Sequence, residues 1–182
     1  MILYTILLLS LLATLSILTT TMRNRISPTP TSYKVKKNLL KLLEEESPHK
    51  IVDLGAGWGT LVFPIAKQHP EATVVGYENS LIPFLFMKIR QMVSKTPNLM
   101  IERRNFYKEN LSSYDIVICY LFPLGMKKLK DKFTHELKNG TSIYTHTFSI
   151  PGWTPTQKWK VKDLYRSTIF QYKISKQEKV ND

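Results

Sequence analysis

The chain has 182 residues, 43% of them hydrophobic, which is enough for one domain with a proper core and makes a second domain unexpected. Lysine and arginine outnumber the acids by 26 to 14 and give a net charge of +12, which favours anionic partners, although a solvated basic surface explains the charge equally well. The single cysteine, Cys119, excludes an internal disulfide and lies in an apolar run typical of a buried side chain.

Residues 1–22 are predicted to form a transmembrane anchor. No residue from Ile2 to Thr21 is charged, and a helix of this length spans about 30 Å, the thickness of a hydrocarbon core. A signal peptide is the alternative, but here the basic residues follow the apolar run instead of preceding it. The positive-inside rule then predicts a single-pass membrane protein with everything after residue 22 on the cytoplasmic side.

Residues 23–33 read as a linker arm, because Pro28 and Pro30 prevent the first helix from continuing into the domain. An amphipathic helix follows and ends near Pro48. The main domain is expected at 34–176, with a polar tail at 177–182.

Strand and helix patterns then alternate along the chain. This alternation predicts an α/β fold, with a doubly wound, Rossmann-like and mostly parallel sheet covered by helices on both faces. The final two segments predict an antiparallel hairpin turning at Tyr165 and Arg166. The predicted strands are 50–54, 73–78, 99–103, 114–121 and 141–149, the helices are 59–68, 80–94 and 124–138, and the hairpin strands are 159–164 and 167–174.

The first predicted strand ends in a glycine-rich turn with Gly55, Gly57 and Gly59 on alternate positions. Glycines permit a sharp turn and the close approach of a ligand. A dinucleotide fingerprint would need its third glycine where Thr60 stands, and no phosphate-loop lysine follows. The turn alone does not distinguish a ligand-binding loop from a plain strand-to-helix connection.

Two acids narrow the choice of ligand. Glu78 follows the second strand, where doubly wound folds place the acid that binds ribose hydroxyls. Asp53 precedes the first glycine and would face the ligand, where a carboxylate repels pyrophosphate but suits a sulfonium or ammonium charge. The pair favours S-adenosylmethionine over NAD.

With these motifs the chain resembles the class I, seven-strand S-adenosylmethionine-dependent methyltransferases. The resemblance implies that the glycines line the methionine part of the cofactor beside Asp53, that Glu78 holds the ribose, and that Asn105 and Phe106 flank the adenine. The full predicted cofactor set is Thr29, Asp53, Gly55, Gly57, Trp58, Gly59, Glu78, Asn79, Asn105 and Phe106.

The fourth strand ends in Tyr120, Leu121, Phe122 and Pro123, which in this superfamily faces the methyl acceptor. Enzymes that methylate base amino groups use an Asn or Asp here, so nucleic acid is an unlikely substrate. A mostly apolar channel with one hydroxyl suits a lysine side chain instead.

A narrower resemblance agrees with a lysine acceptor. Residues 28 to about 172 are similar to the small protein-lysine methyltransferases of archaea and bacteria and to their membrane-embedded mitochondrial relatives. The run from Thr145 to Trp153 is the most distinctive part. Trp58 is a departure, because many relatives have Asp at that position.

The resemblance implies direct in-line transfer of the methyl group to a lysine amine. Tyr120, Phe122 and Pro123 are expected to orient the amine, His146 to accept its proton, and Trp153 to form an aromatic wall. A structural histidine and plain core packing of the aromatic residues are the alternatives.

Three functions remain open at this stage: a membrane-anchored protein-lysine methyltransferase, a methyltransferase of a quinone or acyl compound, and a non-catalytic module with the same fold. The expected partners are membrane lipid, bound through the N-terminal helix, and a membrane-associated protein substrate. No metal site is predicted, because the four histidines show no ligand spacing. The target protein, the number of methyl groups and the oligomeric state are not encoded in any recognisable pattern.

Overall fold

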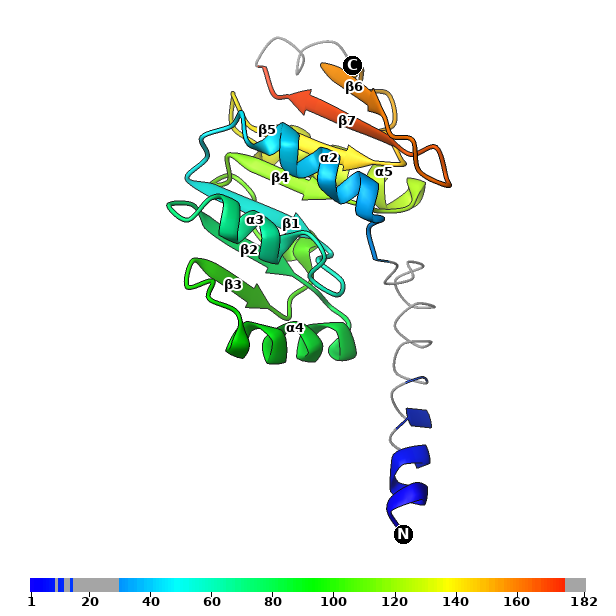
Figure 1. Ribbon diagram of the computed structural model, residues 1–182. Coiled ribbons are helices and arrows are strands. Elements are labelled where there is room, and N and C mark those ends of the chain that lie inside the picture. The colour runs from blue at the N-terminus through cyan, green and yellow to red at the C-terminus, as the bar shows by residue number, and fades with distance from the viewer. Residues whose placement is uncertain (9, 12–13, 15–29, 176–182) are drawn as a thin grey trace.

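The computed structural model describes residues 1–8, 10–11, 14 and 30–175. Within them a seven-stranded sheet has the order β3-β2-β1-β4-β5-β7-β6 (Figure 1). The first five strands are mutually parallel, whereas β7 runs antiparallel to both β5 and β6. The strands are β1 (Lys50–Leu54), β2 (Thr73–Tyr77), β3 (Leu99–Glu102), β4 (Ile116–Cys119), β5 (Ser142–His146), β6 (Gln157–Lys160) and β7 (Thr168–Lys173).

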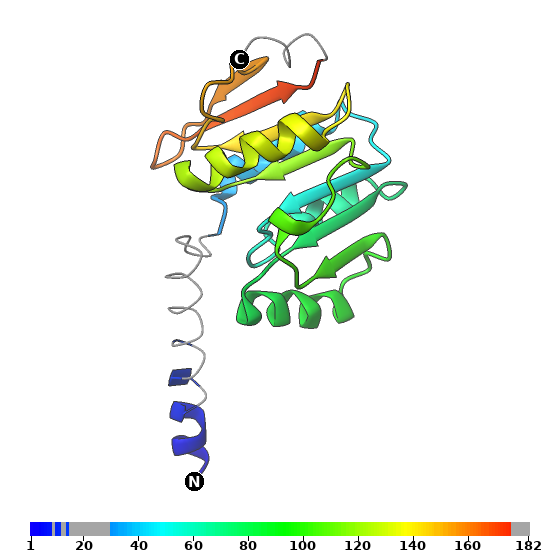
Figure 2. The ribbon, with the colours of Figure 1, turned by 180° about the vertical axis from the view of Figure 1, so that it is seen from behind.

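Helices cover both faces of this sheet, as the alternating pattern predicts. Figure 1 shows α2 and α3 in front of the sheet, and the reverse view in Figure 2 shows α5 on the other face. The helix α4 lies along the β3 edge. The helices are α2 (Tyr33–Leu43), α3 (Val62–Gln68), α4 (Leu81–Val93) and α5 (Pro123–Glu136), with a 3₁₀ turn η1 (Phe106–Lys108) after β3.

The central strand β1 contributes to a separate core on each face. Ile51 packs in the cluster beneath α2 and α3, and its neighbour Val52 packs in the cluster beneath α5, because successive side chains of a strand point to opposite faces. Burial on both faces explains the nearly continuous apolar runs of the parallel strands. Cys119 is buried in the α5 core, as its apolar context predicts.

The chain leaves β1 in one direction to reach β2 and crosses to the other side of β1 to reach β4. This reversal opens a crevice at the carboxyl ends of the parallel strands, which is where doubly wound sheets bind ligands. The glycine turn and the end of β4 both face this crevice.

Two predicted boundaries are wrong for physical reasons. The helix expected from residue 59 begins at Val62, because Gly57 and Gly59 have φ of 54° and 73° and hold the preceding residues in a turn. The two-residue hairpin turn is instead the longer segment 161–167. Asp163 stabilises this loop by accepting hydrogen bonds from the backbone N–H of Ser167 at 2.7 Å and from its hydroxyl at 2.8 Å.

The N-terminal residues 2–8 are helical. Among the residues that the structure describes, no helix is both long and apolar enough to cross a membrane. Half of the predicted anchor 1–22, the linker up to residue 29, and the tail 177–182 lie outside the described residues.

Candidate active site

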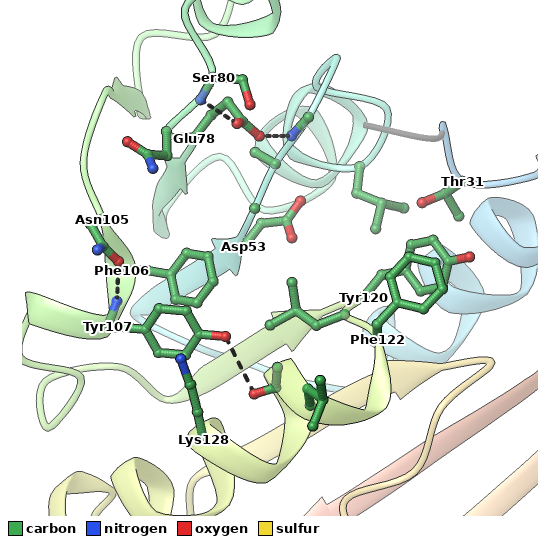
Figure 3. Close-up of a pocket in the computed structure, with 18 of the residues that line it drawn as sticks. Thr31, Asp53, Glu78, Ser80, Asn105, Phe106, Tyr107, Tyr120, Phe122 and Lys128 are labelled. Atoms are coloured by element: carbon green, nitrogen blue, oxygen red, sulfur yellow. Dashed lines mark hydrogen bonds between the residues drawn. The ribbon is translucent and has the colours of Figure 1, made fainter. Parts of the chain in front are cut away.

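A cavity of about 1150 Å³ opens at the carboxyl ends of the parallel strands (Figure 3). Its walls come from the glycine turn, from the loops after β2, β3 and β4, from the start of α5 and from the segment before α2. The lining residues are Pro30, Thr31, Asp53, Gly55, Ala56, Gly57, Trp58, Thr60, Leu61, Glu78, Asn79, Ser80, Asn105, Phe106, Tyr107, Tyr120, Leu121, Phe122, Pro123, Leu124, Gly125, Lys127, Lys128 and Asp131.

The glycine turn is fixed to the end of β2. The backbone N–H groups of Gly55 and Ala56 both donate to the carbonyl of Tyr77 at 2.9 Å. Gly55 has a φ of 88°, a conformation that side chains with a Cβ rarely adopt. Gly55 and Gly57 line the cavity as predicted.

Gly59 is absent from the residues that line the cavity, and its predicted contact with the cofactor stays a prediction. A Cβ at this position would lie 2.7 Å from the ring of Phe63 and 3.0 Å from Met87. Gly59 is therefore needed for the contact between the turn and its covering helices. Its backbone N–H donates to the carbonyl of Ala56 at 2.9 Å and closes the turn.

Glu78 has a second role besides the predicted one. Its two carboxylate oxygens accept hydrogen bonds from the backbone N–H of Gly57 at 2.8 Å and of Ser80 at 2.7 Å (Figure 3). Each carboxylate oxygen can accept a further bond, so the side chain retains capacity for two ribose hydroxyls. The acid predicted to bind ribose thus also holds the glycine turn in place.

Asp53 lies in the middle of the cavity, between Glu78 on one side and Tyr120 and Phe122 on the other (Figure 3). Burial, and secondarily the charge of Glu78, raise the pKa of Asp53 to about 7. Within the described part of the chain no residue donates a hydrogen bond to this carboxylate. A buried carboxylate that receives no hydrogen bond destabilises the folded protein unless a cationic ligand faces it.

The adenine end of the predicted site is formed by the loop after β3. Asn105, Phe106 and Asn79 line the cavity as expected, and the Asn105 side chain caps η1 by accepting from the Tyr107 backbone N–H at 3.1 Å. The Tyr107 hydroxyl donates to the carbonyl of Gly125 at 3.4 Å, and burial raises its pKa to about 12. This neutral phenol joins η1 to α5 across the cavity.

Trp58, a predicted cofactor-binding residue, lies on the cavity rim. Its ring meets the ring of Phe86 on α4 edge-on, with centroids 5.4 Å apart. This position links the glycine turn to the exposed side of α4.

The acceptor end carries a connected set of aromatic rings. Tyr120 stacks on His146 with centroids 4.1 Å apart and lies 6.2 Å from Phe148, which in turn lies 5.4 Å from Phe122. Tyr120, Phe122 and Pro123 all line the cavity, and Pro123 occupies the first turn of α5. These three positions match the predicted location of the methyl acceptor.

His146 lies behind Tyr120 and outside the main cavity. It lines a smaller cavity of about 170 Å³, and its Nε2 is 3.4 Å from the Thr31 hydroxyl. Burial lowers the pKa of His146 to about 4, so the ring is neutral at physiological pH and a weak base. His146 stacks on the Tyr120 ring from outside the cavity, and its expected role as proton acceptor stays a prediction.

Trp153 is also outside the cavity. Its ring packs edge-on against Tyr172 with centroids 6.1 Å apart, in the core beneath α5. Tyr120 and Phe122 line the cavity and Trp153 does not, and an aromatic wall around the acceptor stays a prediction. Thr29 lies outside the described residues, but the adjacent Pro30 and Thr31 do line the cavity.

Several cavity residues have no counterpart among the predicted ones. Lys127, Lys128 and Asp131 reach the cavity from one face of α5, and their spacing with Leu124 is the helical pattern that could have identified them. Lys128 lies 5.8 Å from the Tyr107 ring centroid. Tyr107 directly follows the predicted residues Asn105 and Phe106, and no pattern in the sequence marks it as a cavity residue.

The residues present fit S-adenosylmethionine. Asp53 offers an unsatisfied carboxylate to a cation, Glu78 offers acceptor capacity to hydroxyls, and the loop with Asn105 and Phe106 offers a polar edge beside an aromatic face. A pyrophosphate would instead meet two buried acids. The donor and acceptor set thus selects against the dinucleotide alternative.

Comparison with known proteins also indicates a methyltransferase. A family model described as the ANTKMT methyltransferase domain matches residues 53–157. The chain is 29% identical over 152 residues to a protein-lysine N-methyltransferase of Saccharolobus islandicus (strain REY15A), covering 80% of this chain and 91% of that protein.

A mammalian protein is also similar. The adenine nucleotide translocase lysine N-methyltransferase of Mus musculus is 31% identical over 127 residues. The match covers 68% of this chain, which spans 54% of the length of the mouse protein.

Among solved structures, an RNA methyltransferase from Salinibacter ruber in complex with S-adenosyl-L-homocysteine aligns with a TM-score of 0.72. Its sequence identity is 24%, and the alignment covers 81% of this chain and 95% of that one. At this identity the likeness establishes the fold alone.

Proposed function

Because this chain belongs to the ANTKMT methyltransferase domain family, which makes it a methyltransferase that uses S-adenosylmethionine, we propose that it methylates lysine side chains of a membrane-associated protein. The observation that carries this proposal is the site itself. The buried, unsatisfied carboxylate of Asp53 lies beside the aromatic acceptor end of one continuous cavity.

S-adenosylmethionine, when bound, supplies a methyl group on a positively charged sulfur. Asp53 would balance the positive charge of the methionine end, and the glycine turn allows the ligand to approach its backbone. Glu78 would accept hydrogen bonds from the ribose hydroxyls while keeping its bonds to Gly57 and Ser80. The loop with Asn105 and Phe106 would hold the adenine.

The acceptor end must receive an amine without its proton. Apolar rings at Phe122 and Tyr120 remove water from an entering ammonium group, which lowers the pKa of that group and favours the neutral nucleophile. The Tyr120 hydroxyl supplies a hydrogen-bond partner that orients it. His146 supports the Tyr120 ring by stacking, and the released proton passes to water.

A membrane location accounts for the N-terminal segment. Residues 2–21 carry no charge, and hydroxyls of Thr5, Ser10 and Thr14 donate to carbonyls three or four residues earlier, at 3.2, 2.8 and 2.8 Å. Polar groups satisfied within one segment in this way suit a hydrocarbon environment. The segment would then be an anchor with the domain on the cytoplasmic side, which raises the local concentration of membrane-bound substrates.

The proposal is tested by incubating the full chain with methyl-tritiated S-adenosylmethionine and a membrane fraction. The protein is then separated from the organic phase, hydrolysed and analysed for methyl-lysine. We expect label in methyl-lysine, and none with the Glu78→Ala variant. The Glu71→Ala variant is the matched control, because Glu71 is exposed and away from the cavity.

Label in the organic phase would contradict the protein substrate and favour a lipid-soluble small molecule, which the exposed apolar rim at Phe122 and Leu124 could also admit. Cofactor binding without any transfer would favour a non-catalytic module. Calorimetry of the wild type with S-adenosylmethionine shows whether an absence of transfer comes from a failure to bind the cofactor. The Gly57→Val variant is the negative control for binding.

A further inference from the structure

The helix α4 exposes a broad apolar face. Six of its thirteen residues are large apolar side chains that are at least 37% exposed, whereas only Pro83 and Met87 are buried. Ile89, Met92 and Val93 are the extreme cases, at 67%, 86% and 84% exposed. The six exposed residues are Leu81, Leu85, Phe86, Ile89, Met92 and Val93. Contiguous apolar surface of this kind indicates an interaction site.

Charged residues flank this face. At about 100° per residue, Lys88 and Arg90 fall on opposite borders of the apolar arc. Arg90 is held on its border by the Phe63 ring, whose centroid is 4.1 Å from the guanidinium carbon, and by the Gly59 carbonyl at 3.4 Å. The helix contains no acidic residue. Lys95 and Arg103 add exposed positive charge nearby.

We propose that the exposed face of α4 is a membrane-binding surface that lies in the interface of an anionic bilayer. An interfacial helix has aliphatic and aromatic residues on one face and lysine or arginine at its borders, where long side chains reach the headgroups. The α4 helix has this arrangement along an outer edge of the domain, beside β3 (Figure 1). This surface is distinct from the N-terminal segment and does not depend on which substrate is methylated.

Charge favours lipid over a second protein surface. A second copy of this chain would bring the same cations against Lys88 and Arg90, and the chain carries a net charge of +12. Anionic headgroups instead attract these residues. The uncharged residues 2–21 of the same chain also favour lipid as the neighbouring phase.

The surface adjoins the active site through one aromatic contact. Phe86 on α4 meets Trp58, which lines the cavity. With α4 in the interface, the cavity rim lies next to the headgroups. A lysine at the membrane boundary of an embedded protein is then the acceptor within reach.

The test places an environment-sensitive fluorophore on the full chain. The one native thiol, Cys119, is buried and has a raised pKa, so an introduced cysteine reacts selectively. Ile89→Cys and Met92→Cys report on α4, and Gln157→Cys on β6 is the control at the opposite edge of the sheet. Each labelled protein is mixed with vesicles of phosphatidylcholine and phosphatidylglycerol that contain spin-labelled lipid.

We expect the emission at residues 89 and 92 to shift to shorter wavelength and to be quenched by spin label just below the headgroups. The probe at residue 157 should do neither. Unquenched emission at both α4 positions on vesicle-bound protein would overturn the proposal. A shift to shorter wavelength without quenching by lipid would also overturn it, since another protein segment would then cover the face.

Discussion

The backbone N–H of Gly57 donates to the carboxylate of Glu78 at 2.8 Å, so the acid that is predicted to bind the ribose also shapes the glycine turn. The other oxygen of Glu78 accepts from Ser80 at 2.7 Å, at the N-terminus of α4. Replacing this residue should therefore affect folding and cofactor binding together.

Glu78→Gln tests this double role. The amide has one NH₂ group, which must face a backbone N–H of either Gly57 or Ser80, so one buried donor loses its partner. The free energy of unfolding should fall by about 1–3 kcal/mol, and cofactor affinity should fall roughly tenfold or more. Denaturant unfolding and calorimetry measure the two effects. Unchanged stability would show that Glu78 does not hold the turn, and Glu71→Gln is the exposed control.

The raised pKa of Asp53 predicts opposite pH trends for stability and for binding. The folded-state pKa is about 7, above the unfolded value of about 3.9, so the ligand-free protein loses stability as pH rises from about 4 to 7. Asp53→Asn removes this slope. The variant should gain up to about 4 kcal/mol over wild type at pH 8 and nothing at pH 4.

Cofactor binding should follow the reverse course, because a cation needs the ionised form of Asp53. Affinity of the wild type for S-adenosylmethionine should rise as pH increases through 7 and then level off, with release of a proton on binding at lower pH. Calorimetry in buffers of different ionisation enthalpy detects that proton. A flat pH profile in the wild type would refute the assignment of Asp53 to the cationic end.

The packing role of Gly59 can be tested against a second glycine. Gly59 and Gly140 both have positive φ, at 73° and 89°, but only at Gly59 would a Cβ meet neighbours. Gly140→Ala should cost about 1–2 kcal/mol from backbone strain alone. Gly59→Ala should cost clearly more, because Phe63 and Met87 must also move. Equal losses, measured by urea unfolding, would mean that packing at the turn is not the constraint.

Tyr120 and His146 are expected to contribute to catalysis in different ways, which single substitutions can separate. Tyr120→Phe keeps the aromatic stack but removes the hydroxyl, so kcat should fall roughly tenfold with little change in cofactor affinity. His146→Phe retains a ring against Tyr120 and should keep most of the activity at neutral pH. Loss of all turnover in the histidine variant, with the fold intact, would support His146 as the proton acceptor that the sequence predicts.

The sequence predicts the parallel sheet and the cofactor well because both depend on short-range patterns. The apolar runs of β1 and β2 are buried on both faces, and Asp53 and Glu78 each come at a strand end, so chain order fixes their location. The parallel order, the helices on both faces and the cofactor are confirmed. The assignment of catalytic residues stays a prediction.

The remaining features depend on contacts between distant segments. Gly59 is constrained by Met87 on α4, the His146 ring lies 3.4 Å from the hydroxyl of Thr31 before α2, and Trp153 packs against Tyr172. The hairpin length depends on the side-chain bonds of Asp163. The spacing of residues along the sequence does not predict these contacts, since each contact depends on which groups the completed fold brings together.

The outermost strand, β6, has only four residues, and three of them, including Lys158 and Lys160, are exposed. An edge strand offers unpaired backbone groups to any other chain, and short length with lysine side chains is a recognised protection against such pairing. Crowding of many copies would therefore not extend the sheet from molecule to molecule through this edge. The exposed lysines of β6 therefore protect the protein against aggregation through this edge.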